Sequence, residues 1–253
     1  MTDTNVSARD DDEEDENPQE IAAALIQMLD ADVERIIARY DKLLETMFAN
    51  GVTREQYQEY DGERESLSRE IFRAFFAYVE GTVFSLKQYA MIQLGLLDQP
   101  LEPCEVDAVL ECTWRMRDNG VVEYKPANIT FMQNLLFMVR LQERLHGLEK
   151  QLDRNSIWFR CLAGSVHVRD RVMHPKHPSD LEVDVEDLKT LWLARTGFIA
   201  LLEKFMGPRP WKLPDVWLHR PERMPEDMRL DVRKALGLDP GGTDWPGWPG
   251  RGN

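Results

Sequence analysis

The segment between residues 67 and 94, LSREIFRAFFAYVEGTVFSLKQYAMIQL, is the strongest constraint on what this chain can fold into. Its apolar side chains recur at steps of three and four residues, as in an α-helix, and adjacent ones such as Phe75 and Phe76 widen the apolar surface. The residues that follow this spacing are Phe72, Phe75, Phe76, Val79, Val83, Leu86, Tyr89, Ala90 and Gln93. The segment therefore predicts a core helix that is apolar over much of its circumference.

Four further segments show helical periodicity. We expect these helices at about residues 18–50, 128–147, 155–173 and 184–206. A capping pattern at Thr53-Arg54-Glu55-Gln56 predicts one more helix start. Glycine and proline mark their ends: Gly51 ends the first helix, and Pro175 forbids simple continuation of the fourth. Proline has no backbone N–H and clashes with the preceding turn, so it rarely lies within a helix.

Residues 113–125 have a different pattern. Residues that favour β-strands flank the dipeptide Asn119-Gly120, which is a common two-residue hairpin turn. Together with the helices, this predicts an all-α fold: a helical bundle of about five long helices with a small β-hairpin insertion.

The charge and the prolines divide the chain into three parts. Residues 1–20 carry nine acidic side chains and one arginine, which leaves only −6 of the formal net charge of −14 for the remainder. Such a block predicts an acidic disordered arm over residues 1–17; docking of this arm on a basic patch is the alternative. Eight of the 14 prolines follow Gly207, so residues 208–253 are predicted to be a Pro/Trp-rich tail. The helical domain is expected over residues 18–207.

Several classes of protein are disfavoured by the composition. No apolar run approaches the roughly 18 residues that a membrane span needs, and no secretory signal pattern opens the chain. Cys104, Cys112 and Cys161 are odd in number and form no C-x-x-C pair, which argues against disulfides and zinc and favours core thiols. We expect a cytoplasmic protein without a membrane contact, a metal or a cofactor.

A basic cluster interrupts the acidic sequence. Between Arg154 and His177 there are five Lys or Arg residues and one acid, Asp170. On a helical wheel one stripe collects Arg160, His167, Arg171 and His174. This stripe is either a solvated helix face or an RNA-binding surface, extended by Lys176 and His177.

On the same helical wheel Arg169 lies apart from that stripe. It falls in the apolar arc, between the directions of Trp158 and Leu162. A guanidinium on an apolar face is costly unless it is paired or belongs to an interface or a site. A structural ion pair with an acid on a neighbouring helix, such as Glu80, is one explanation; a functional site is the other.

Arg169 and His174 form an R-x4-H pair in the segment RDRVMHP, with Asp170 after the arginine and Pro175 after the histidine. The spacing alone is weak evidence, but with these neighbours the segment resembles the signature of the HEPN superfamily. The resemblance implies an all-helical domain, and many members are metal-independent endoribonucleases of toxin–antitoxin or phage-defence systems. Only this short motif is specific to the family. The acidic arm, the first long helix, the hairpin and the Pro/Trp-rich tail are not part of the family pattern.

The residue types suit that chemistry. Cleavage of RNA without a metal uses the neighbouring 2′-hydroxyl as the nucleophile, so a group that exchanges protons near neutral pH is needed, and His174 is the candidate. A fixed cation must stabilise the charge that develops on the phosphoryl oxygens, for which we expect Arg169. Asp170 would orient either residue.

Helix geometry complicates this assignment, because five residues of ideal helix place Arg169 and His174 about 140° apart. They converge only if the last turn unwinds, or if two subunits share the site, as is typical in the family. We therefore expect a homodimer that acts on RNA, with an antitoxin or regulatory protein as a further partner. A second interpretation stays open: a non-catalytic helical interaction or sensor module in which Arg169 is an ion-pair partner and His174 caps the helix.

Overall fold

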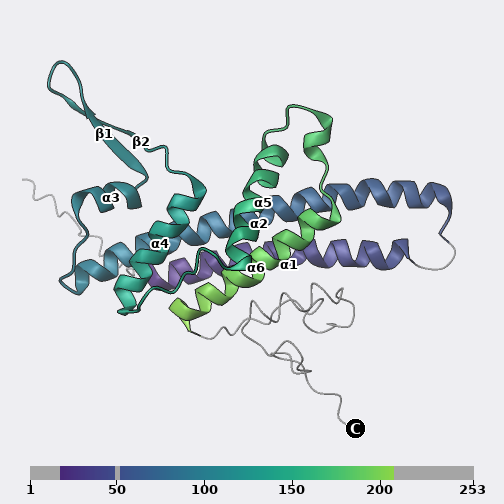
Figure 1. Ribbon diagram of the computed structural model, residues 1–253, viewed down its shortest axis with the longest axis horizontal. Coiled ribbons are helices and arrows are strands. Elements are labelled where there is room, and N and C mark those ends of the chain that lie inside the picture. The colour runs from purple at the N-terminus through teal and green to yellow at the C-terminus, as the bar shows by residue number, and fades with distance from the viewer. Residues whose placement is uncertain (1–17, 49–51, 208–253) are drawn as a thin grey trace, which may run out of the picture.

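The computed structural model describes residues 18–48 and 52–207 of the chain (Figure 1). The predicted arm over residues 1–17, the helix end at Gly51 and the tail over residues 208–253 lie outside the described residues.

Two long helices form the base of the fold. Helix α1 (Pro18–Met47) and helix α2 (Arg54–Leu96) lie side by side and are joined at one end (Figure 1). Helix α2 begins where the capping pattern predicted: the hydroxyl of Thr53 accepts from the N–H of Gln56, and the Gln56 side chain accepts from the N–H of Thr53. The predicted core segment thus forms about the C-terminal two-thirds of one continuous helix.

Three more helices pack against this pair: α4 (Phe131–His146), α5 (Ile157–Met173) and α6 (Val185–Met206). The main hydrophobic core draws buried side chains from all five long helices, and Phe72, Phe75 and Val79 of α2 have no exposed surface. The prediction of an all-α bundle of five long helices with a hairpin insertion is confirmed. Among the described helices, none has an apolar stretch long enough to cross a lipid bilayer.

The contact between α5 and α6 depends on a glycine. A Cβ atom at Gly197 of α6 would fall 2.3 Å from the Cβ of Trp158, so only glycine lets this indole lie against the helix. Helix α4 starts three residues later than predicted, because the side chain of Thr130 caps it in a second reciprocal pair with Gln133.

The hairpin has the predicted place and turn. Strand β1 (Cys112–Met116) pairs antiparallel with β2 (Val122–Pro126), and Gly120 takes a positive φ of 76° in the turn. It projects away from the helices (Figure 1).

Two short elements were not predicted, namely helix α3 (Pro103–Val109) and the 3-10 helix η1 (Pro178–Leu181). Both are too short to give a periodic signal. The expectation of core thiols is wrong for Cys104, which is exposed in the first turn of α3, and Cys112 and Cys161 are only partly buried.

Candidate functional site

Helix α5 carries the R-x4-H motif and stays regular to its end. His174 is the C-terminal capping residue, and its N–H donates to the carbonyl of Asp170 at 3.0 Å. The backbone leaves the helix at His174, with φ −130° and ψ 55°, and Pro175 follows. The last turn is therefore wound, and unwinding does not bring Arg169 and His174 together within one chain.

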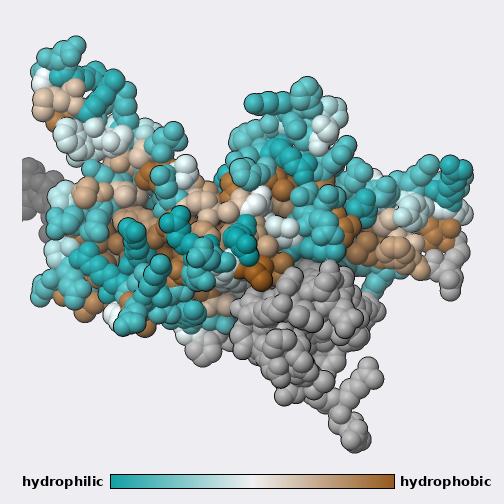
Figure 2. Space-filling model, in the orientation of Figure 1, coloured by the Kyte–Doolittle hydropathy of each residue, from teal (hydrophilic) through white to brown (hydrophobic). Residues whose placement is uncertain are grey.

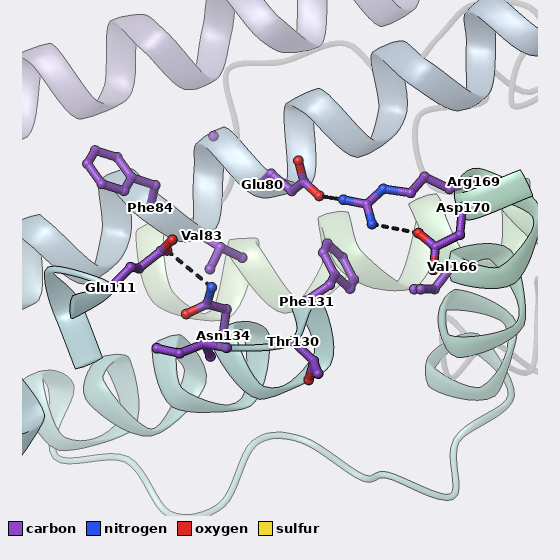
Figure 3. A pocket seen from close by; sticks show the side chains of 12 residues that line it. Glu80, Val83, Phe84, Glu111, Thr130, Phe131, Asn134, Val166, Arg169 and Asp170 are labelled. Carbon is purple, nitrogen blue, oxygen red and sulfur yellow. Dashed lines mark hydrogen bonds and ion pairs between the residues drawn. The ribbon is translucent and has the colours of Figure 1, made fainter. Parts of the chain in front are cut away.

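Arg169 points from α5 towards α2. Its Nη2 forms an ion pair with Glu80 of α2, and its Nη1 donates to Oδ1 of Asp170 at 2.8 Å (Figure 3). The guanidinium also lies 5.5 Å from the ring centre of Phe76 and 5.9 Å from that of Phe131. The ion pair with Glu80, one of the two explanations for an arginine on an apolar face, is confirmed. Its apolar surroundings come from α2 and α4 of the same chain.

The Arg169 side chain nevertheless reaches the surface, with 23% of its side chain exposed. A guanidinium carries five N–H donors, and the bonds to Glu80 and Asp170 use one each. The other donors have no acceptor among the described residues. Arg169 is thus oriented by two carboxylates while part of its side chain stays exposed.

An open cleft of about 780 Å³ begins at Arg169. Its walls are α2 around Glu80 and Phe84, the start of α4 around Phe131, and α5 around Arg169 (Figure 3). Glu111, between α3 and β1, lines it as well. A volume of this order suits a small organic ligand or one nucleotide.

A buried lysine stands behind the cleft. Lys87 of α2 has no exposed surface, and its Nζ lies 2.7 Å from Oε1 of Glu111 and 2.8 Å from Oδ1 of Asn134. Both partners line the cleft. Glu111 adopts a positive φ of 52°, a backbone conformation that is unfavourable for residues other than glycine.

The sequence pattern alone did not indicate Lys87, Glu111 or Asn134 as site residues. A signal was present, because Lys87 lies one helical step from Val83 and Ala90 in the core pattern of α2. A lysine at such a position requires a partner. Nothing in the sequence indicated that Glu111 and Asn134 supply it.

His174 is exposed at the end of α5 and does not line the cleft. Four of the five residues predicted to bind RNA are exposed as well, namely Arg160, His167, Lys176 and His177. The projecting connection between α5 and α6, which includes His174, Lys176 and His177, has a largely hydrophilic surface (Figure 2).

Arg171, the fifth predicted RNA contact, has a structural partner. Its Nη2 donates to Asp187 of α6 at 2.6 Å, and its Nη1 donates to the carbonyl of Glu182. These bonds hold the connection between α5 and α6, so Arg171 is not a free cation on the basic face.

The same connection is held by Asp180. Its carboxylate accepts from the N–H of Lys176 at 2.7 Å and from that of His177 at 2.9 Å. The hydrogen bond from the Lys176 N–H, followed by that from His177, lowers the pKa of Asp180. The backbone that follows His174 is fixed by these bonds.

The chain matches no protein-family model, no curated protein and no solved structure. In residues 18–48 and 52–207, no three His, Cys, Asp or Glu side chains are grouped so that they could hold a metal ion.

Proposed function

We propose that this protein is a metal-independent endoribonuclease of the HEPN type that acts as a homodimer, in phage defence or in a toxin–antitoxin system. The observation that carries the proposal is the state of Arg169. Its guanidinium is oriented by two carboxylates, keeps N–H donors that have no acceptor in residues 18–48 and 52–207, and faces an open cleft, and an exposed histidine ends the same helix.

The proposed reaction needs no group beyond these side chains and water. The 2′-hydroxyl attacks the adjacent phosphorus, an imidazole accepts its proton, and the bond between phosphorus and the 5′-oxygen breaks as that oxygen is protonated. The products are a 2′,3′-cyclic phosphate and a 5′-hydroxyl end. Arg169 would bind the non-bridging oxygens, where negative charge develops in the transition state.

The homodimer supplies what one chain lacks. Because α5 is wound to its end, Arg169 and His174 of one chain lie on different faces of the helix. In the proposed site Arg169 therefore acts with His174 of the partner subunit. A two-fold dimer contains two such sites, each with one imidazole, which acts as the base while water donates the proton to the departing 5′-oxygen.

The test is cleavage of single-stranded RNA and tRNA by the purified full chain in the presence of a chelator. We expect Arg169→Ala and His174→Ala each to lose about 100-fold or more of the activity. Arg35→Ala is the matched control, since Arg35 is an exposed α1 cation paired with Asp32. If the wild-type protein leaves these RNAs intact, or if His174→Ala cuts equally well, the proposal is wrong.

A second candidate function is a non-catalytic helical interaction or sensor module. The observation that favours it is the ion pair of Arg169 with Glu80, together with the contact of the guanidinium with two aromatic rings, since such contacts also serve to join α5 to α2 and α4. In that case Arg169→Ala lowers the melting temperature, and the wild-type protein shows no RNA cleavage.

A further inference from the structure

We infer that the cleft beside Arg169 binds one unstacked nucleotide, with its phosphate at Arg169 and a base that carries an amino group, guanine above all, towards Glu111. The inference rests on the proposed function in taking RNA as the source of this nucleotide. It goes further by assigning a base preference to residues outside the R-x4-H motif.

The charges of the cleft select the ligand. Among the described residues that line it, three are carboxylates, Glu80, Glu111 and Asp170, and one is a cation, Arg169. An anionic group of the ligand can therefore be held only beside Arg169. The other charged side chains of the cleft are carboxylates, which accept hydrogen bonds, so the rest of the ligand must offer donors. A nucleotide combines an anionic phosphate with a base whose N–H groups donate.

Glu111 is the acceptor in the best position to distinguish bases. Its Oε1 takes hydrogen bonds from both Lys87 and Asn134, while its Oε2 accepts none among the described residues. Guanine presents two adjacent donors, N1–H and the exocyclic amine, and either of them can donate to Oε2. Uracil presents one N–H between two carbonyl oxygens, which the carboxylate would repel. A guanine is therefore favoured over a uracil.

The apolar part of the cleft suits a flat ring. Phe84 lines the cleft from α2 with 49% of its surface exposed, and no other described residue in the cleft is a large apolar side chain of comparable exposure. Phe131 lines it from α4, next to the guanidinium of Arg169. Aromatic side chains are the usual partners of unstacked bases, and each such contact is worth a measurable part of the affinity.

The test is a titration of the full wild-type chain with GMP, AMP, CMP and UMP, followed by NMR or calorimetry. These nucleotides have no bond for the enzyme to cut, so binding is measured apart from cleavage. We expect GMP to bind about tenfold more tightly than UMP, and Arg169→Ala to weaken all four. Phe84→Leu should weaken GMP binding about fivefold or more, while Phe84→Tyr, which keeps a ring, restores it. Leu96→Ala, an exposed residue farther along α2, is the matched control.

The outcomes separate this inference from the proposed function. Equal binding of the four nucleotides, or no effect of Phe84→Leu, overturns the inference even if RNA is cut. Tighter binding of spermidine or of a lysine-rich peptide than of GMP also overturns it, because the carboxylates then select a cation. Selective GMP binding without RNA cleavage supports the inference and contradicts the nuclease.

Discussion

At the scale of single residues, the balance of charge around Arg169 decides what this side chain can do. Glu80 and Asp170 together carry more negative charge than one guanidinium neutralises. Both therefore compete with any phosphate that approaches Arg169. Glu80 comes from another helix and is 46% exposed, so it can be changed without creating a cavity.

Replacing Glu80 by glutamine tests this competition. We expect Glu80→Gln to bind mononucleotides more tightly, because one of the two competing charges is gone while the amide still accepts a hydrogen bond. Because the pair is partly exposed, the free energy of unfolding should fall by no more than about 1 kcal/mol. Calorimetric titration and urea denaturation measure the two effects. Weaker nucleotide binding in Glu80→Gln would show that Glu80 does not compete with the phosphate for Arg169.

At the scale of secondary-structure elements, the connection between α5 and α6 positions the end of the motif helix. Arg171 ties this connection to Asp187, and Asp180 accepts the backbone N–H groups that follow Pro175. His174 thus lies at the start of a segment fixed at several points. The backbone beside His174 gains a defined position in this way, and a catalytic group must be held in place.

The pH dependence of this connection follows from Asp180. Its pKa is lower in the folded protein than in the unfolded chain, so its stabilising contribution is present at pH values above the unfolded pKa. The contribution is lost as the pH falls through the lower, folded pKa. We expect Asp180→Asn to be less stable than the wild type at neutral pH, with the difference shrinking in acid. Amide exchange at Lys176 and His177, followed against pH, measures the effect directly. An unchanged difference between the two proteins down to acid pH would contradict it.

At the scale of the whole molecule, the fold places the cleft and His174 at different sides of one helix. The five long helices share a single main core, and the cleft opens at its edge between α2, α4 and α5. A site that joins the two therefore requires a second copy of the chain.

Mixing two inactive variants tests this arrangement. If Arg169 of one subunit acts with His174 of the partner subunit, a mixture of Arg169→Ala and His174→Ala contains heterodimers with one intact site. The mixture should recover about a quarter of the wild-type activity, since half of the dimers are mixed and each has one of its two sites. Light scattering checks that the subunits dimerise and exchange. A mixture that stays inactive despite subunit exchange would show that no site is shared.

The structure confirms what local sequence could predict. The periodic side chains of α2, the cap at Thr53 and the turn at Asn119-Gly120 all depend on neighbours within a few residues, and each was predicted with little error. The short α3 and η1 were missed for the same reason, because a helix of one or two turns has no period to detect. The sequence also named Glu80 as one possible partner for Arg169, since both are charged residues on apolar faces.

By itself, then, the sequence determined the five long helices, the hairpin and the position of the R-x4-H pair, since backbone hydrogen bonding and side-chain period are local properties. Only the tertiary structure decided that Arg169 pairs with Glu80, that Arg171 pairs with Asp187, and that Lys87 is buried against Glu111. These contacts join residues from different elements. They exist because the helices cross at particular angles, and packing of the whole core sets those angles.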